Sequence, residues 1–187
     1  QRPQRETNPL SYLYTRMKKN KKNIRHLSLA ELEQYFEELG EKKFRAKQVY
    51  EWLWQKHAMS FDGMTNLSKD LRQKLGDSFS FPALTIDTVQ QSADGTIKSR
   101  FRTHDGHLVE GVLIPTTSRY TACVSSQIGC SLSCKFCATG YMDRKRNLEF
   151  DEIYDQVVLI NQQCESTYKK KLSNIVFMGM GEPLLNY

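Results

Sequence analysis

Three cysteines within eight residues are the part of this sequence best suited to chemistry. Cys130, Cys134 and Cys137 form a C-x3-C-x2-C run, and Phe136 stands directly before the last cysteine. Thiolates are the usual protein ligands of iron–sulfur clusters, and electron-transfer clusters use four of them. Three thiolates from one short loop can hold three irons of a 4Fe-4S cluster and leave the fourth iron open. The spacing therefore predicts a cluster that can bind a substrate.

In this spacing, the molecule at the open iron is usually S-adenosylmethionine (SAM), which chelates the iron through its amino and carboxylate groups. The protein then supplies orientation and electrostatics, while the radical chemistry belongs to the cofactor. Structural zinc is the alternative interpretation. Cys134 and Cys137 would form one zinc-binding pair, with Cys123 and Cys130 as a poorly spaced second pair. The spacing favours the cluster but leaves both metals open.

The composition points to a folded protein of a reducing compartment. Hydrophobic residues make up 39% of the 187-residue chain, which is enough for a core in one domain plus a smaller one. Five cysteines, an odd number, argue against a disulfide framework. No run approaches the roughly 20 apolar residues of a membrane span. We therefore expect a cytoplasmic protein with no membrane partner.

Positive charge is concentrated at the start of the chain. The net charge of the whole chain is +6, and residues 1–26 hold eight Lys or Arg against one acid, Glu6. The rest of the chain is close to neutral. We expect residues 1–27 to form a disordered basic tail that either binds a polyphosphate such as RNA or serves only as a solvated arm.

Apolar periodicity predicts helices first and strands after them. Residues 28–80 have helical spacing: Ser28 and Glu31 form a capping-box pattern, Gly40 ends the first helix, and a third helix over residues 67–75 ends at Gly76. Residues 84–88, 97–102 and 108–114 alternate with turns between them and predict a three-stranded β-meander.

The remaining residues predict a parallel β-α-β crossover. A strand at 120–125 leads into the cysteine loop, a helix runs from about 149 to 164, and a strand at 174–178 leads into Gly179-Met180-Gly181-Glu182-Pro183. The cysteine loop and the Gly-Glu-Pro turn should be neighbours, because both follow the carboxyl ends of parallel strands. One such unit cannot close a barrel, and the chain begins at Gln1, so we expect a fragment of a longer protein.

Several co-linear motifs stand out in the chain: residues 123–130 (CVSSQIGC) with Cys134, Phe136 and Cys137, residues 146–148 (RNL), residues 179–186 (GMGEPLLN) and the helical segments 39–49 and 61–68. Together they resemble the RlmN family, the radical-SAM adenine-C2 methyltransferases of 23S rRNA and tRNA. The resemblance implies an α/β protein. The basic tail 1–27 lies outside the match. The resemblance implies a helical RNA-binding accessory domain at 28–80, a β extension at 81–115, and at 116–187 the start of a radical-SAM partial (β/α)6 barrel.

The resemblance also implies a reaction and roles for individual residues. Members of the family move a methyl group to a cysteine, activate it with a 5′-deoxyadenosyl radical, and resolve the protein–RNA adduct with a second cysteine, which leaves a disulfide. Cys130, Cys134 and Cys137 resemble the cluster ligands, Cys123 the resolving cysteine, and Glu110 the proton acceptor. Gly181 and Glu182 resemble the turn that contacts the SAM amino group, and Phe136 a residue near the SAM adenine.

Further expectations concern the activity of the fragment, its partners and its rival functions. No cysteine of the chain matches the methyl-carrying one, so we expect the fragment to be inactive alone. The family further implies a monomer and an electron donor such as flavodoxin or ferredoxin. Two rival functions remain: the C8-methylating rRNA resistance enzyme, whose turn lacks the counterpart of Pro183, and a zinc-stabilised RNA-binding module without catalysis.

Overall fold

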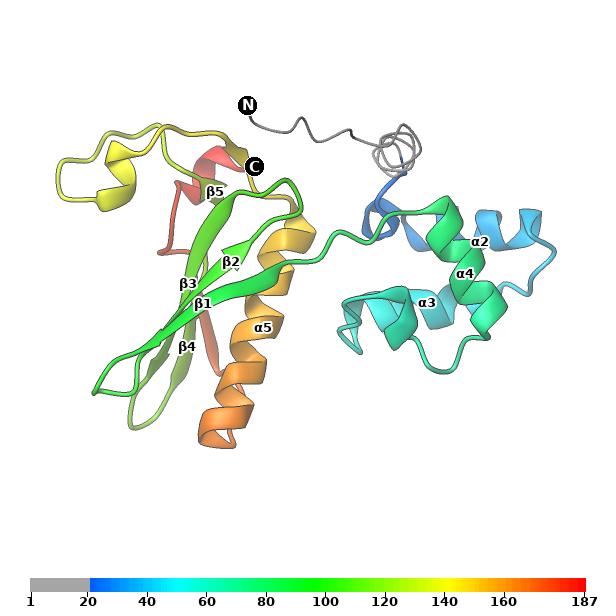
Figure 1. The fold of residues 1–187 in the computed structure, drawn as a ribbon, viewed down its shortest axis with the longest axis horizontal. Coiled ribbons are helices and arrows are strands. Elements are labelled where there is room, and N and C mark those ends of the chain that lie inside the picture. The colour runs from blue at the N-terminus through cyan, green and yellow to red at the C-terminus, as the bar shows by residue number, and fades with distance from the viewer. Residues whose placement is uncertain (1–20) are drawn as a thin grey trace, which may run out of the picture. The chain divides into compact units, whose positions relative to one another are not determined.

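The computed structural model describes residues 21–187, which fall into two compact units. The first unit ends at Pro82 and is helical, and the second comprises Ala83–Tyr187 and contains the strands (Figure 1). Helices followed by a sheet are what the periodicity predicted. Within residues 21–187, no helix combines the length and apolar character needed to cross a bilayer.

The helical unit packs three α-helices around one apolar core. Its elements are the 3-10 turn η1 (Ile24–His26), α2 (Leu29–Glu38), α3 (Phe44–Trp54), the 3-10 turn η2 (Phe61–Gly63) and α4 (Lys69–Ser78). The predicted capping box begins α2: Ser28 Oγ accepts from the Glu31 N–H at 3.2 Å, and Glu31 Oε2 accepts from the Ser28 N–H at 2.7 Å. Hydrogen bonds from Ser28 lower the pKa of Glu31 to about 2.

Two sequence expectations differ from the structure in this unit. Residues 21–27 belong to the folded unit rather than to a tail, since Ile24 and Leu27 are buried in its core and Asn23 forms a β-bridge with Ser80. The expectation for residues 1–20 lies outside the described residues. The third helix begins at Lys69 and continues through Gly76 to Ser78, because Ser68 caps it and the residue after Gly76 keeps helical geometry.

The second unit is built on one mixed five-stranded sheet with the order β1-β2-β3-β4-β7. The strands are β1 (Thr85–Gln91), β2 (Ile97–Arg102), β3 (Leu108–Pro115), β4 (Tyr120–Cys123) and β7 (Asn174–Val176). β1, β2 and β3 form the predicted antiparallel meander. β4 pairs antiparallel with β3 and parallel with β7. The meander and the β-α-β unit therefore share a single continuous sheet.

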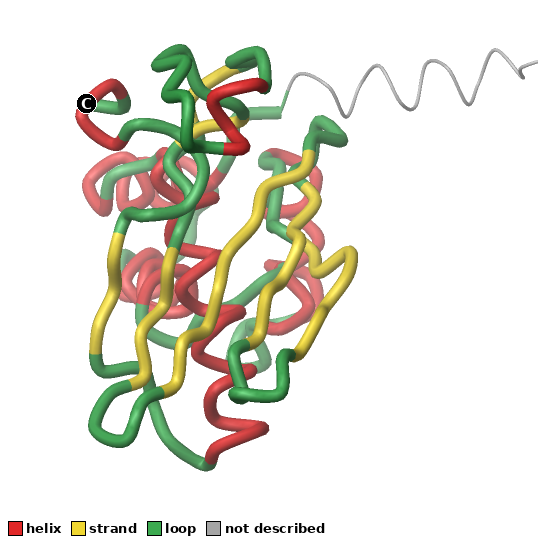
Figure 2. The backbone as a smooth tube through the Cα atoms, turned by 90° about the vertical axis from the view of Figure 1, so that its left-hand side faces the viewer, coloured by secondary structure: helices red, strands yellow, loops and turns green. Residues whose placement is uncertain are grey.

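Helix α5 (Phe150–Tyr168) provides the crossover between β4 and β7 and packs along one face of the sheet (Figure 1, Figure 2). Gly111 of β3 marks a close approach of α5 to the sheet: a Cβ atom there would lie 2.8 Å from the Phe101 ring and 3.0 Å from Ile160 Cδ1. Ser99 of β2 and Gln163 of α5 also exchange hydrogen bonds on this face. Side chains alternate along a strand, so the neighbours of Ser99 and Gly111 point to the opposite face.

Candidate functional site

Both candidate loops lie at the end of the sheet where β4 and β7 finish (Figure 1). The cysteine loop covers residues 129–145 and is closed at its base by two short strands, β5 (Gln127–Ile128) and β6 (Arg146–Asn147), which pair antiparallel. The turn after β7 covers residues 177–182 and leads into the 3-10 turn η4 (Pro183–Leu185). Parallel strands place their carboxyl ends together, which brings the bases of the two loops side by side.

The cysteine loop presents three free, partly exposed thiols, those of Cys130, Cys134 and Cys137. The backbone N–H groups of Gly140 and Thr139 donate toward the Cys137 sulfur and lower the pKa of that thiol. Within residues 21–187, however, no three His, Cys, Asp or Glu side chains lie close enough together to hold a metal ion. The expected ligands are thus present on one loop but are not gathered into a metal-binding arrangement.

The donor set fits a 4Fe-4S cluster better than it fits zinc. An iron–sulfur cluster takes thiolates, and a lowered thiol pKa favours the thiolate form that acts as a ligand. The second pair that a zinc site would need includes Cys123, which is 8% exposed and lies in β4 rather than in the loop. Burial raises the pKa of the Cys123 thiol, and a hydrogen bond from the Met178 N–H only partly offsets it.

The turn after β7 packs so closely against the end of β4 that it requires glycine. A Cβ atom at Gly179 would lie 2.7 Å from both Ser125 Oγ and the Val124 carbonyl oxygen. The Gly179 N–H donates to that carbonyl at 3.0 Å, and the Met180 N–H donates to Ser125 Oγ at 2.8 Å. These contacts hold Gly181 and Glu182 next to the base of the cysteine loop.

Glu110 and Cys123 lie on the open face of the sheet, opposite α5. The register pairs Cys123 with Val112, and Glu110 is two residues from Val112 on the same strand. Two residues apart on one strand means the same face, so Glu110 and Cys123 are diagonal neighbours. The Glu110 carboxylate is half-exposed and forms an ion pair with Lys98 Nζ at 3.1 Å.

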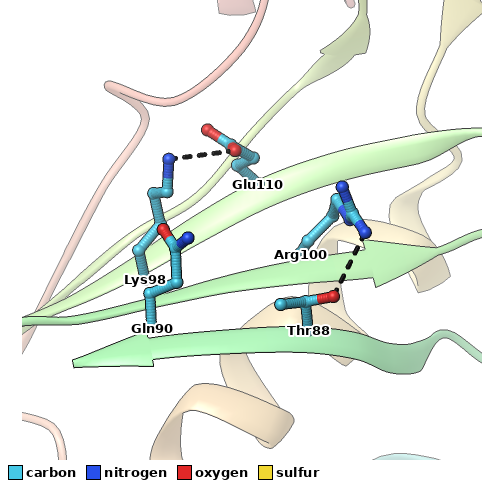
Figure 3. Close-up of a pocket in the computed structure, with 5 residues that line it drawn as sticks. All are labelled: Thr88, Gln90, Lys98, Arg100 and Glu110. Atoms are coloured by element: carbon cyan, nitrogen blue, oxygen red, sulfur yellow. Dashed lines mark hydrogen bonds and ion pairs between the residues drawn. The ribbon is translucent and has the colours of Figure 1, made fainter.

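A shallow pocket surrounds Glu110 on this open face (Figure 3). Besides Glu110 and Lys98 it is lined by Thr88, Gln90 and Arg100, which come from β1 and β2. Arg100 donates to Thr88 Oγ1 at 3.1 Å and also pairs with Asp87. The candidate base therefore stands in a polar, cationic surrounding that is open to solvent. Phe136 contrasts with it, since its ring is 93% exposed on the cysteine loop.

Sequence reasoning missed the buried polar side chains that join the two loops. Gln127 is fully buried, and Asn147 and Asn186 bond across long sequence separations. Asn186 Nδ2 donates to the carbonyl oxygens of Ser126 and Leu148, at 2.9 Å in each case. The polar run Ser125-Ser126-Gln127 inside an apolar segment was the available signal, because buried polar groups need partners.

Comparison with known proteins identifies the class of protein that shares this fold. The protein-family model of the ribosomal RNA large subunit methyltransferase N-terminal domain matches residues 22–80 of this chain. A crystal structure of a radical SAM methyltransferase from Sphaerobacter thermophilus superposes with a TM-score of 0.78 at 42% identity, covering 89% of this chain and 49% of that one. The fold of this chain is therefore shared with about half of a radical-SAM methyltransferase.

Curated relatives narrow the class to one family. The probable dual-specificity RNA methyltransferase RlmN of Cytophaga hutchinsonii is 64% identical over 167 residues, which are 89% of this chain and 46% of that protein. The dual-specificity RNA methyltransferase RlmN of Geotalea uraniireducens is 48% identical over 166 residues, 89% of this chain and 47% of that protein. The chain belongs to the RlmN family, and it spans about half the length of the curated relatives it matches.

Proposed function

We propose that the protein containing this chain is a radical-SAM methyltransferase that methylates carbon 2 of adenosine in 23S rRNA and tRNA. The strongest support is the loop with free thiols at Cys130, Cys134 and Cys137, whose base is bonded to the Gly181-Glu182 turn. The family assignment adds weight, since the relatives are named dual-specificity RNA methyltransferases.

Cys130, Cys134 and Cys137 would hold a 4Fe-4S cluster, and the Gly181-Glu182 turn would bind the SAM amino group. Bound together, cluster and SAM would supply the radical chemistry that carbon 2 of adenine needs, because this carbon has no nucleophilic character. Phe136, which is exposed on the same loop, would cover the SAM adenine. The loop would have to draw its three thiols together as it takes up the cluster.

Glu110 and Cys123 would act on the RNA adduct from the open face of the sheet. The half-exposed Glu110 carboxylate would accept the proton from carbon 2 of the target adenine. Cys123 would then attack the sulfur of the methyl-carrying cysteine, which no cysteine of this chain matches. The S–S bond would form as the C–S bond to the RNA breaks, and the carbon would keep that electron pair and take up a proton to become the methyl group. The raised pKa of the Cys123 thiol keeps it protonated at neutral pH until a base removes the proton.

The larger architecture follows from the same family. The helical unit would be the accessory domain that binds RNA, strands β1 to β3 the extension, and residues 116–187 the start of a partial (β/α)6 barrel. We further propose a cytoplasmic monomer that receives electrons from a flavodoxin or ferredoxin. The two rivals, a C8-methylating enzyme and a zinc-stabilised RNA-binding module, are less compatible with the relatives' names and with the thiol set.

Metal analysis of the whole protein tests this function. Anaerobic reconstitution should give about four irons per chain with broad visible absorption. Replacing Cys130, Cys134 and Cys137 by Ala should remove both signals. Cys164→Ala is the matched control: this cysteine is fully buried in α5, so its replacement should leave the iron content unchanged. Stoichiometric zinc in anaerobically purified protein, with no iron uptake, would show that the protein is the zinc module instead.

A further inference from the structure

The side chain of Gln127 lies fully buried between the base of the cysteine loop and the turn after β7. Its Oε1 accepts a hydrogen bond from the Glu182 N–H at 3.0 Å. Its Nε2 donates to Asn147 Oδ1 at 2.8 Å. One amide group therefore bonds at the same time to the turn and to the opposite strand at the base of the loop.

The backbone of the turn rests directly on Gln127. Gly181 has a φ of +92°, and a Cβ atom at that position would lie 2.4 Å from Gln127 Cβ. The Gln127 N–H also donates to the Met180 carbonyl oxygen at 3.2 Å. Because a side chain at Gly181 would collide with Gln127, the turn can approach this closely only with glycine.

Asn147 extends the connection on the other side of the loop base. Its Oδ1 also accepts from Arg144 Nη2 at 2.8 Å, and its Nδ2 donates to the Leu185 carbonyl oxygen at 3.1 Å. Asn147 is the register partner of Gln127 in the β5–β6 pair, which encloses the cysteine loop. The two amides thus fix both the ends of the loop and both ends of the segment from Glu182 to Leu185.

We propose that Gln127 and Asn147 are positioning residues that set the Gly181-Glu182 turn in register with the cysteine loop. This inference rests on the proposed function, in which the loop holds the cluster and the turn binds the SAM amino group. SAM must reach the open iron and the turn at once, so its binding depends on their mutual placement. Catalytic geometry of this kind is sensitive to displacements of about 1 Å.

Only an amide satisfies both partners of residue 127. The Glu182 N–H needs an acceptor. Asn147 presents Oδ1 to residue 127, an orientation that the bond from Arg144 fixes, and this oxygen can pair only with a donor. Gln127→Met keeps the length and apolar volume of the side chain but loses both hydrogen bonds. Gln156→Met is the matched control, because Gln156 is equally buried and bonds to Ser125 instead of Glu182.

The experiment uses the whole reconstituted protein and follows the electron paramagnetic resonance signal of the reduced cluster during titration with SAM. Gln127→Met should keep the iron content and the SAM-free signal of the wild type, but need about tenfold more SAM, or a still larger excess, for the half-maximal spectral change. Asn147→Ala, at a half-buried position, should shift the titration in the same direction. Gln156→Met should titrate like the wild type.

A second measurement does not depend on the cluster. In the protein without cofactors, hydrogen–deuterium exchange at residues 179–186 should be faster in Gln127→Met than in the wild type and in Gln156→Met. Wild-type SAM affinity in Gln127→Met, or an equal loss in Gln156→Met, would overturn the proposal. A wild-type protein that takes up no cluster would instead contradict the proposed function, so the two failures can be distinguished.

Discussion

Ser125 and Ser126, two neighbouring serines just after β4, differ in the hydrogen bonds that their hydroxyl groups form. Ser125 Oγ donates to the Glu110 carbonyl oxygen at 2.6 Å and accepts from the Met180 N–H at 2.8 Å. Ser126 is equally buried, but its Oγ has no hydrogen-bond partner among residues 21–187. A buried hydroxyl without a partner costs free energy, whereas one that satisfies two buried backbone groups stabilises the fold.

The two serine-to-alanine variants should therefore differ in stability. Ser125→Ala leaves a buried N–H and a buried carbonyl without their partner and should lower the free energy of unfolding by about 2 kcal/mol. Ser126→Ala removes only an unsatisfied hydroxyl and should leave the free energy of unfolding unchanged or raise it. Urea unfolding of both variants beside the wild type measures the difference. Equal losses would mean that Ser126 has a partner in solution.

At the scale of elements, one arginine joins three parts of the second unit. Arg146 of β6 donates from Nε to Asp105 Oδ2 at 2.8 Å, in the turn between β2 and β3. It also donates from Nη1 to Glu152 Oε2 at 2.7 Å, in the first turn of α5. Glu152 in turn accepts from the Glu149 N–H at 2.9 Å, which caps the helix. The strand that closes the cysteine loop is thereby fixed to the sheet and to α5.

This arrangement predicts a pH dependence of stability. Hydrogen bonds from Arg146 hold the pKa of Asp105 well below its usual range. The pKa is lower in the folded than in the unfolded state, so the ionised carboxylate stabilises the fold above about pH 4, and this contribution fades as the pH falls further. Asp105→Asn should cost about 1 kcal/mol at pH 7, a value discounted for partial exposure, and less at pH 3.

Urea unfolding at the two pH values checks this prediction. Asp94→Asn serves as the control in the neighbouring hairpin turn, because the Asp94 carboxylate accepts from Thr96 and not from an arginine. A cost of Asp105→Asn that stays the same at pH 3 and pH 7 would show that the ion pair with Arg146 contributes nothing to stability.

At the scale of the whole molecule, the basic start of the chain divides into two parts. Within residues 21–26 the cations already have protein partners: Lys21 Nζ donates to the Gly76 carbonyl oxygen at 2.6 Å, Lys22 pairs with Glu31, and Arg25 bonds to the Pro82 carbonyl oxygen. Five further cations, Arg2, Arg5, Arg16, Lys18 and Lys19, stand in residues 1–20. Those five are the ones to test for binding to RNA phosphates.

Deleting residues 1–20 of the whole protein should weaken RNA binding and flatten its dependence on salt. For every phosphate that the protein no longer neutralises, the slope of log K against log salt becomes shallower by roughly 0.7 to 0.9. The modified adenosine should stay the same, because binding to phosphates carries no base information. Filter binding over a salt series measures the slope, and a variant with the five cations replaced by Gln separates charge from length. An unchanged slope would mean that residues 1–20 only act as a solvated arm.

The sequence by itself determined the candidate thiol set and the succession of elements. The spacing of Cys130, Cys134 and Cys137 identified the thiol set, and periodicity located the helices, the meander and the parallel crossover. Both signals are local: ligand spacing and side-chain alternation repeat within a few residues, so they can be read from the chain alone. One boundary differed: helix α4 runs past Gly76 to Ser78, because Gly76 does not adopt the positive φ that commonly ends a helix.

Only the tertiary structure decided which residues meet. The placement of Glu110 and Cys123 on one face depends on the register between β3 and β4, and the hydrogen bond from the Glu182 N–H to Gln127 spans 55 positions of sequence. Neither pairing produces a periodic pattern in the sequence. A buried amide such as that of Gln127 cannot be distinguished from an exposed polar residue in the sequence until its hydrogen-bond partner is known. The tertiary structure also left the three thiols of the loop apart. A short loop allows many conformations, and spacing alone selects none of them.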